Sequence, residues 1–221
     1  MHERRPDHAQ VDFSETLGTI GGLECKIHFY VMSLPHSDAV FVKGYPTETT
    51  EAFCDGHVSA FAFFGGIPQT ILYDNTKIAV ARILGDRTRV RTQRFTELQS
   101  HYLIDGRFGR PARENDKGNV EGMVGFTRRN FMVPPPRFNS FDDLNAHLEQ
   151  RCLERQGDKL RGHEQTIGNR LISNREALMG LPVAEYEACV HVSTRATSIS
   201  TVRYRSNDYS VPVTYAHHDV H

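Results

Sequence analysis

Three acidic residues of this chain could form a metal-dependent catalytic site if folding brings them together. Asp12, Asp74 and Glu121 lie 62 and 47 residues apart in the sequence. Cleavage of a phosphodiester by in-line displacement can use two Mg²⁺ ions about 3.5–4 Å apart, and Mg²⁺ prefers hard oxygen ligands such as carboxylates. Carboxylates gathered without a cation would repel one another. A cluster of these three side chains would therefore predict phosphoryl transfer assisted by metal ions.

The segment around Glu121, "ENDKGNVEGMVGFTRRNF" from 114 to 131, combines a helical pattern with residues that helices disfavour. Lys117 and Arg128 share a helix face with Glu121, at spacings of four and seven residues. Glycines occupy much of that side, and each costs roughly 0.5–1 kcal/mol relative to alanine in a helix interior. These glycines are Gly118, Gly122 and Gly125. Two explanations are open: they let a DNA backbone approach closely, or they let the helix pack tightly on a sheet.

Two other carboxylates, Glu114 and Asp116, lie near Glu121 in the sequence. They are expected at or before the start of the helix, where Asn115 or Asp116 provides the N-cap. Glu121 is therefore the acidic residue expected within the helix itself.

Apolar patterns predict the elements that would position these acids. Residues 10–17 alternate, and residues 23–34 and 39–45 are more continuously apolar, so three strands in an antiparallel meander are expected. A helix over 49–64 follows, with an apolar face that includes His57, and Gly65-Gly66 end it. Residues 69–75 then predict a short strand that ends at Asp74. We interpret His57 as a hydrogen-bonded core residue and not a metal ligand.

The following elements are mainly helical. Residues 92–103 predict a helix, residues 104–110 a short strand or loop, and residues 140–156 an amphipathic helix with Ser140 as its N-cap. The helix that carries Glu121 is expected to stop at "VPPPRF", because proline cannot continue the hydrogen-bond ladder.

The order of three strands, a helix, a fourth strand and further helices predicts an α/β fold: an RNase H-like mixed sheet flanked by helices. A right-handed crossover would lay the fourth strand parallel to the first. Asp12, in the middle of the first strand, would then lie beside Asp74 at the end of the fourth. The later helix crosses the sheet and could add Glu121.

We predict three parts of the chain: an RNase H-like catalytic core over 1–155, a helical linker over 156–183, and a small β-barrel-like domain over 184–221. Strand patterns in the last part cover 188–193, 200–205 and 208–215, with a turn at 205–208. Three strands barely make a stable sheet alone. This β domain is therefore expected to be incomplete.

Composition favours a soluble intracellular protein. The longest apolar runs are far shorter than the roughly 20 residues that span a bilayer, and the N-terminus lacks a signal-peptide core. The four cysteines form no CxxC element, which excludes a zinc ribbon and favours reduced thiols. His217, His218 and His221 are interpreted as incidental and not as a metal site.

The net charge of −1 hides an uneven distribution. Residues 82–137 carry 12 Lys/Arg against 6 Asp/Glu, a formal charge of +6, whereas residues 1–81 carry 5 against 10, a formal charge of −5. A basic segment next to acidic ones is compatible with polyanion binding near carboxylates or with a solvated charged face. The arginines that could follow a DNA backbone, or lie in a solvated loop, are Arg87, Arg89, Arg91 and Arg94.

Four stretches carry a resemblance to a known family: "QVDFSE", "FFGGIPQTILYDN", "SHYLIDGRFGRPARENDKGNVEGMVGFTRRNFMVP" and "YSVP". In order and spacing they resemble the IstA transposases of bacterial insertion sequences, within the DDE transposase and retroviral integrase superfamily. The likeness covers nearly the whole chain. It implies that Asp12, Asp74 and Glu121 are the catalytic triad. In small departures, Ser14 stands where relatives usually have glycine, and "RENDKG" differs slightly from their pattern.

The resemblance also implies a reaction and partners. The expected activity is DNA 3′-end cleavage followed by strand transfer, with two Mg²⁺ ions, or Mn²⁺ as a substitute, held by the triad. Expected partners are the transposon ends and target DNA, further copies of the chain in a homo-multimer, and an AAA+ ATPase helper resembling IstB. The expected location is the bacterial cytoplasm, in association with the nucleoid. Residues expected to contact DNA phosphates are Lys117, Arg128, Arg129, Arg113 and Arg110.

Two alternatives stay open. Full-length relatives carry an N-terminal helix-turn-helix region, which nothing before Gln10 supplies. The chain could therefore be a truncated, non-catalytic remnant that binds DNA or partner subunits through its arginine-rich middle. A general RNase H-like nuclease is a further alternative, and rapid cleavage of RNA–DNA hybrids would favour it.

Overall fold

The computed structural model of the chain describes residues 5–73, 80–83, 89–91, 93–108, 120–189, 193–204 and 206–220, with residues 80–83, 89–91 and 120–123 described by their backbone alone. These residues form two compact units, 1–188 and 189–221. Among the described residues, no helix is long and apolar enough to cross a membrane.

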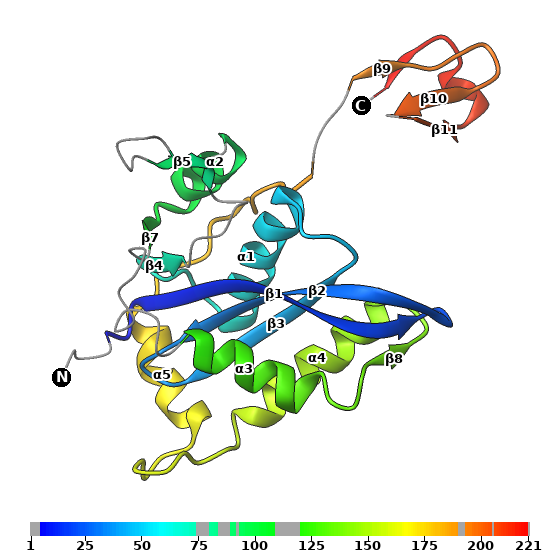
Figure 1. Cartoon of the computed structure of the whole chain (residues 1–221). Helices are drawn as coiled ribbons and strands as arrows, with labels where there is room; N and C mark the ends of the chain where they lie inside the picture. The colour runs from blue at the N-terminus through cyan, green and yellow to red at the C-terminus, as the bar shows by residue number, and fades with distance from the viewer. Residues whose placement is uncertain are drawn as a thin grey trace. The chain divides into compact units, whose positions relative to one another are not determined.

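A mixed sheet forms the centre of the first unit (Figure 1). Its strand order is β3-β2-β1-β4-β7, and β8 also pairs with β1. β1 pairs antiparallel with β2 and parallel with β4, while β4 pairs parallel with β7. The bounds of these strands are β1 His8–Ile20, β2 Leu23–Leu34, β3 Ala39–Tyr45, β4 Thr70–Tyr73, β7 Asp105–Phe108 and β8 Arg137–Phe138. The predicted RNase H-like arrangement is confirmed, including the parallel return of the fourth strand to the first.

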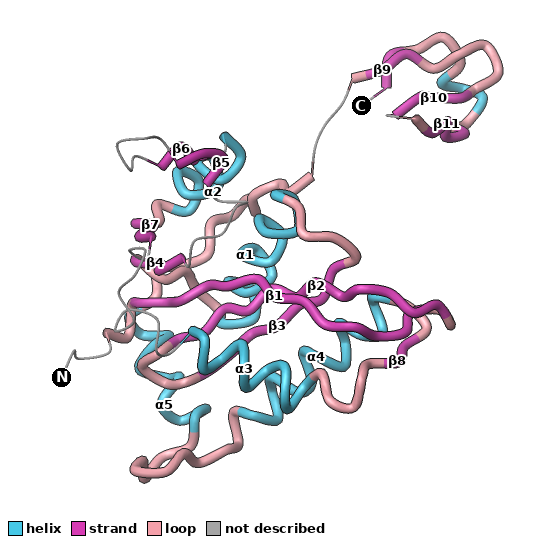
Figure 2. Tube along the Cα trace, in the orientation of Figure 1, coloured by secondary structure: helices cyan, strands magenta, loops and turns pink. Residues whose placement is uncertain are grey.

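Helices cover both faces of this sheet (Figure 2). The side chains of β2 alternate between two cores: Tyr30 and Met32 belong to the core shared with α1 and α2, whereas Phe29 and Val31 belong to the core shared with α3 and α4. Burial on both faces explains why β2 is almost continuously apolar. The helices are α1 Thr50–Phe64, α2 Gln93–Tyr102, α3 Val120–Phe131, α4 Phe141–Arg155 and α5 Ile167–Ala177.

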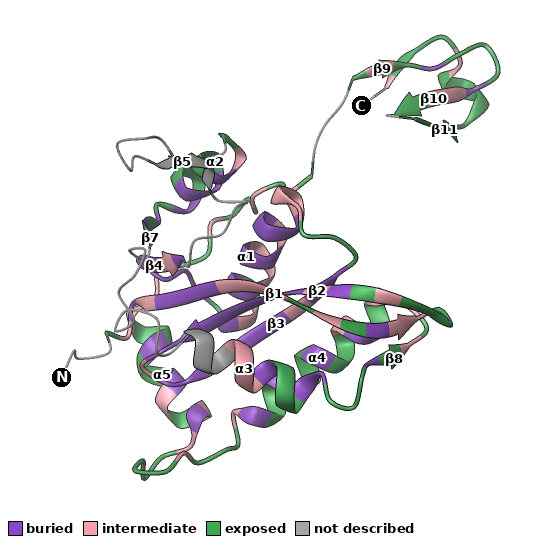
Figure 3. Cartoon of the chain, in the orientation of Figure 1, coloured by how far each residue is buried: buried purple, intermediate pink, exposed green. Residues whose placement is uncertain are grey.

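The N-cap expected at Ser140 and the helix end expected at Gly65-Gly66 are confirmed, whereas Thr49, expected as the first helical residue, is the N-cap of α1. Thr49 accepts a hydrogen bond from the backbone N–H of Ala52, and Ser140 accepts one from that of Asp143. Gly65 ends α1 with a left-handed φ of 77°, a conformation that glycine adopts at little cost. Figure 3 shows the buried residues of α1 and of the central strands, and the exposed tip of the β1–β2 hairpin.

Among the described residues of the first unit, three strands were not predicted from the sequence. β5 Val80–Ile83 and β6 Arg89–Arg91 pair as a hairpin in the basic region that follows β4. β8 follows the proline run, and Thr19 donates its backbone N–H to Pro136 O at 2.8 Å just beside it. Proline ends α3, as predicted, but the chain then adds a short parallel strand to β1.

Residues 156–183 were expected to be a helical linker. They contain α5, which lies within the first unit. Ile167 and Leu171 of α5 are buried in the core shared with α1. The chain then crosses back over α2, where Tyr186 donates its N–H to the Tyr102 hydroxyl at 3.1 Å and its own hydroxyl to Arg94 O at 3.1 Å. This segment therefore contributes to the core of the first unit.

The second unit, 189–221, contains short strands. β10 and β11 form an antiparallel hairpin, and β9 pairs with β12. The strand expected over 208–215 stops at Ser210, and a 3₁₀ turn, η2, follows Pro212. Residues 188, 189 and 193 of the strand expected over 188–193 lie outside any strand. The bounds are β9 Thr194–Arg195, β10 Thr201–Tyr204, β11 Asn207–Ser210, η2 Val213–Tyr215 and β12 Asp219–Val220.

Candidate active site beside strand β1

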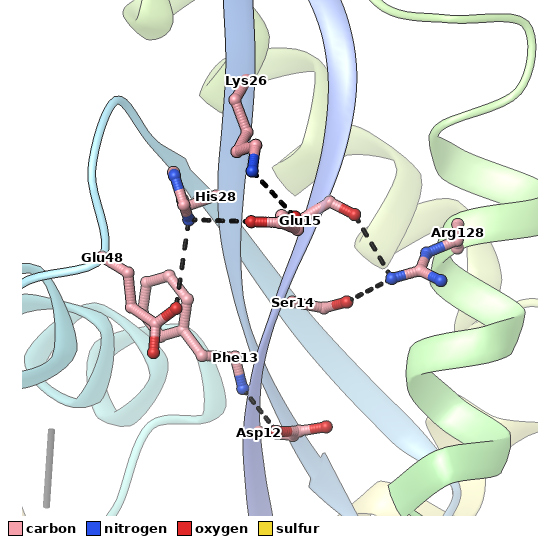
Figure 4. A network of polar contacts seen from close by, with 8 residues as sticks. All are labelled: Asp12, Phe13, Ser14, Glu15, Lys26, His28, Glu48 and Arg128. Atoms are coloured by element: carbon pink, nitrogen blue, oxygen red, sulfur yellow. Dashed lines mark hydrogen bonds and ion pairs between the residues drawn. The ribbon is translucent and has the colours of Figure 1, made fainter. Parts of the chain in front are cut away.

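Asp12 lies on the face of β1 that α3 covers. Its cross-strand partner in β2 is Val31, which is buried in the core shared with α3 and α4. The neighbouring residue Val11 points to the opposite face, into the core shared with α1. Asp12 is half-buried, and its Oδ1 accepts a hydrogen bond from the backbone N–H of Phe13 at 2.7 Å. Figure 4 shows Asp12 and Ser14 extending from β1 on the side of the helix that carries Arg128.

The parallel pairing of β1 and β4 brings the end of β4 close to Asp12. Tyr73, the last residue of β4, is the register partner of Val11. Asp74 follows Tyr73 directly in the sequence and lies outside the described residues. The described end of β4, at Tyr73, therefore lies beside the residue that precedes Asp12 in β1.

Glu121 lies in the first turn of α3, and only its backbone is described. Two turns further along the helix, Arg128 donates from Nη2 to Ser14 Oγ at 2.6 Å and to Glu15 O at 3.2 Å (Figure 4). After α3, β8 pairs in parallel with the end of β1. α3 thus runs along β1 in the same direction, and its first turn, with Glu121, lies toward the Asp12 end.

The residues predicted to contact DNA divide into three groups. Arg128 makes the two contacts to β1 just described. Arg129 is exposed on α3, and its Nη1 lies 3.1 Å from where a Cβ on Gly125 would be. The remaining three, Lys117, Arg113 and Arg110, lie outside the described residues.

The surroundings of Gly125 bear on why this helix contains glycines. A Cβ added at Gly125 would come within 4 Å of the Arg129 guanidinium. Tight packing on the sheet therefore does not account for a glycine at this position. Gly118 lies outside the described residues, and no side-chain surroundings are described at Gly122.

A charged cluster beside Ser14 was not predicted from the sequence. Lys26 Nζ lies 3.0 Å from Glu15 Oε1, and this hydrogen bond is the main reason that the pKa of Glu15 is lowered. His28 Nδ1 lies 4.0 Å from a carboxylate oxygen of Glu15 and 4.0 Å from one of Glu48. The β1–β2 register pairs Glu15 with His28, so correct strand alignment was the signal that could have revealed the cluster.

His57 is a buried core residue, as predicted. Its Nδ1 lies 2.8 Å from Phe53 O and its Nε2 lies 3.1 Å from the Tyr73 hydroxyl. Burial lowers the pKa of His57 to about 4, so the ring is neutral at physiological pH. The contact with Tyr73 links α1 to the end of β4.

The donor set available to a metal ion consists of carboxylate oxygens. Asp12 supplies the kind of hard oxygen ligand that Mg²⁺ and Mn²⁺ prefer. Within the ranges that the structure describes, no three His, Cys, Asp or Glu side chains gather in a group that could hold a metal ion. The side chains of Asp74 and Glu121 are outside those ranges. The four cysteines are free thiols, and burial raises the pKa of Cys54 and of Cys152 to about 12.

Sequence comparison assigns most of this part of the chain to a known family. The family described as "Integrase core domain" matches residues 2–114, and the family "Mu transposase, C-terminal domain" matches residues 181–221. A solved structure of the simian T-cell lymphotropic virus intasome, in complex with PP2A regulatory subunit B56 gamma, shares the fold. Its TM-score is 0.58 at 16% identity, over 85% of this chain and 60% of that one.

Several curated relatives are transposases. The "Transposase for insertion sequences IS1326/IS1353" of Pseudomonas aeruginosa is 38% identical over 94% of this chain and 41% of its own length. A "Transposase" of Aminobacter aminovorans is 35% identical over 96% of this chain and 42% of its own length. The "Transposase for insertion sequence element IS21" of Pseudomonas aeruginosa is 33% identical over 92% of this chain and 52% of its own length.

The chain thus spans about two fifths to one half of the length of these relatives. The integrase core match covers the strands β1 and β4 that approach the candidate site. The chain belongs to the integrase core domain family, as its resemblance to the IstA-like transposases predicts.

Proposed function

We propose that this chain is the catalytic core of a DNA transposase that cleaves the 3′ ends of an insertion sequence and joins them to target DNA. The observation that carries the proposal is the parallel pairing of β1 and β4, which places Tyr73 beside Val11. The face of the sheet on which Asp12 lies is covered by α3. On this basis we propose that Asp74, the residue after Tyr73, and Glu121, in the first turn of α3, complete the site with Asp12. The transposase names of its relatives support the same activity.

In this proposal, Asp12, Asp74 and Glu121 hold divalent cations. Bound Mg²⁺ or Mn²⁺ would make the attacking hydroxyl more nucleophilic and stabilise the departing oxygen. Asp12 is well suited to such a role because β1 is paired on both sides, which fixes its backbone. The hydrogen bond from the N–H of Phe13 orients the carboxylate.

Substrate binding in this proposal depends on cations next to the acidic site. Arg129 is exposed on α3 and can reach a phosphate. Lys117, Arg113 and Arg110 precede α3 in the sequence and are proposed to contact the same DNA. The net charge of +6 over residues 82–137 would offset the charge of a DNA backbone close to the carboxylates.

The proposed partners follow from the resemblance to the IstA transposases. We propose that the chain acts as a homo-multimer on transposon ends and target DNA in the bacterial cytoplasm. An AAA+ ATPase helper resembling IstB is proposed to assist it. Co-purification of tagged and untagged copies would test the multimer, separately from the chemistry.

The test is a strand-transfer assay. A labelled duplex carrying the end of the element would be incubated with supercoiled plasmid and millimolar Mn²⁺. We expect wild-type chain to join the two DNAs, and Asp12→Asn and Glu121→Gln to lose at least roughly 10³-fold in rate, since each would remove a metal ligand. Glu15→Gln, an exposed carboxylate of the same strand, is the matched control and should retain activity. Strand transfer that is equal in wild type and Asp12→Asn would contradict the proposal.

A second substrate separates the proposal from its alternatives. Rapid hydrolysis of an RNA–DNA hybrid, without plasmid joining, would favour a general nuclease. DNA binding by wild type with no cleavage of either substrate would favour a non-catalytic, DNA-binding protein.

A further inference from the structure

We propose that Arg128 is a positioning residue that holds α3 against β1 and thereby sets the distance between Glu121 and Asp12. The inference rests on the proposed function for its catalytic consequence. Its structural part, the attachment of α3 to β1, can be measured without any activity.

Arg128 contacts β1 at two points. Its Nη2 donates to the side-chain oxygen of Ser14 at 2.6 Å and to the backbone oxygen of Glu15 at 3.2 Å (Figure 4). Hydrogen bonds from a guanidinium are stronger than those between neutral groups, and the short distance to Ser14 agrees with this. One side chain of α3 is therefore attached to two consecutive residues of β1.

The attachment lies next to the candidate catalytic residue. Ser14 is two residues after Asp12 and points to the same face of the sheet, because side chains alternate along a strand. The Cα atoms of Asp12 and Ser14 are about 6.6 Å apart along β1, at about 3.3 Å per residue. A change in the Arg128 contact would therefore move α3 relative to Asp12 itself.

Arg128, which makes this attachment, also shares a helix face with Glu121. Seven residues separate Glu121 from Arg128, which is nearly two turns and about 10.5 Å of helix. α3 and β1 run in the same direction. The step from Arg128 back to Glu121 along the helix and the step from Ser14 back to Asp12 along β1 therefore lead toward the same end of the site. One contact at Arg128 thus limits both the sliding and the rotation of α3.

Other side chains of α3 pack on the sheet and on α4. Phe126 lies under the guanidinium of Arg155 in α4, with its ring centroid 3.8 Å from Cζ. Phe131 is buried in the core shared with α4, with Arg151 over its ring. These contacts hold α3 against α4 and the sheet by packing. The hydrogen bonds of Arg128 add polar contacts, at defined positions, with the strand that carries Asp12.

Arg129 provides a natural contrast. It is adjacent in sequence and carries the same charge, but one residue along a helix rotates its side chain by about 100°. Both arginines are exposed, but Arg128 contacts β1, whereas Arg129 lies over Gly125. We assign the attachment to Arg128 and a DNA contact to Arg129, whereas the sequence analysis expected a DNA contact from both arginines.

The experiment compares Arg128→Ala, Ser14→Ala, the double variant and Arg129→Ala, with Lys26→Ala as a control for loss of one surface charge nearby. Hydrogen exchange of the α3 amides would be measured first, in metal-free buffer without DNA. We expect exchange in α3 to rise at least roughly tenfold in Arg128→Ala and in Ser14→Ala, the effect of one hydrogen bond to a charged group. Arg129→Ala and Lys26→Ala should match wild type.

DNA affinity in the presence of EDTA and the strand-transfer rate would follow. Arg128→Ala should keep its DNA affinity within about twofold and lose roughly 10- to 100-fold in rate, as expected when a reacting group is misplaced by about 1 Å. In the double variant, Ser14→Ala should lower the strand-transfer rate little further than Arg128→Ala alone, because both substitutions remove the same contact. Arg128→Lys, which keeps one donor group, should recover part of the rate.

Two results would overturn the inference. One is an unchanged rate of amide exchange in α3 of Arg128→Ala. The other is that Arg128→Ala loses as much DNA affinity as Arg129→Ala does, while the effects of Arg128→Ala and Ser14→Ala on the strand-transfer rate add up in the double variant. If wild type shows no strand transfer, the proposed function fails, and the exchange measurement still decides whether Arg128 attaches α3 to β1.

Discussion

The imidazole of His57 in α1 lies 3.1 Å from the hydroxyl of Tyr73, the last residue of β4. Both residues are fully buried, and Tyr73 directly precedes Asp74. A core contact between helix and strand therefore supports the end of the strand that leads into the candidate site. Replacement of His57 should affect stability first and activity second.

We predict that His57→Leu destabilises the chain by roughly 1–3 kcal/mol at pH 7, since the Tyr73 hydroxyl loses a buried partner. Tyr73→Phe in the same background should restore part of this loss, because both partners of the contact are then apolar. Urea denaturation followed by circular dichroism would measure the free energy of unfolding. Equal stabilities for wild type and His57→Leu would contradict the importance of the contact.

The same residue predicts a pH dependence. Burial lowers the pKa of His57 to about 4, from a usual value of 6.5. Between these values the unfolded chain binds a proton that the folded chain does not, so stability is full above pH 6.5 and falls toward pH 4. The contribution lost is about 3 kcal/mol, at 1.36 kcal/mol per pKa unit. Denaturation midpoints at pH 7 and pH 5 should differ less in His57→Leu than in wild type.

A divalent cation is predicted to bind next to Asp12. Crystals soaked in millimolar Mn²⁺ should show an anomalous peak within about 2.5 Å of an Asp12 carboxylate oxygen. Asp12→Asn should lose that peak, because the amide is a weaker ligand, whereas Glu15→Gln should retain it. A peak confined to the Glu15–Glu48 region in wild type would place the metal site elsewhere.

Continuous apolar patterns made the central elements predictable. The bounds of β2 and β3 agree with those expected from sequence. Both faces of β3 and of the second half of β2 are buried, and the apolar runs end where these strands end. The caps Thr49 and Ser140 were also predictable, since capping is a local interaction. The approach of β4 to β1 followed from the handedness of the crossover.

The contacts that connect these elements were not predictable from local patterns. Helical spacing placed Arg128 on the face of Glu121, but the contact with Ser14 joins residues 114 positions apart. Periodicity within one helix carries no information about such a partner. The packing of α5 was missed because Ile167 and Leu171 are few among polar residues. β8 was missed because the proline run before it indicates only where α3 ends.

Arg129 is predicted to neutralise one DNA phosphate. Arg129→Ala should weaken DNA binding at all sequences to a similar extent, because a phosphate contact carries no base information. The slope of log K against log salt concentration should become less steep by about 0.9, the value for one phosphate. Fluorescence anisotropy over a salt series would measure it, with Lys26→Ala as the charge control. An unchanged slope in Arg129→Ala would exclude a phosphate contact.

The last prediction compares two glycines within helices. A Cβ on Gly56 of α1 would lie 2.6 Å from the ring of Tyr30, whereas a Cβ on Gly125 of α3 would meet only the flexible end of Arg129 at 3.1 Å or more. Gly56→Ala should therefore destabilise the chain by roughly 1–3 kcal/mol through overpacking. Gly125→Ala should stabilise it by roughly 0.5–1 kcal/mol, the usual preference of a helix interior for alanine.

DNA binding then tests why α3 contains a glycine that its packing does not require. If Gly125 leaves room for a DNA backbone, Gly125→Ala will lower DNA affinity while it raises the free energy of unfolding. The two effects have opposite signs, so general loss of structure cannot imitate the result. A stabilised Gly125→Ala variant with unchanged DNA affinity would remove Gly125 from the proposed DNA interface and leave that role to the arginines alone.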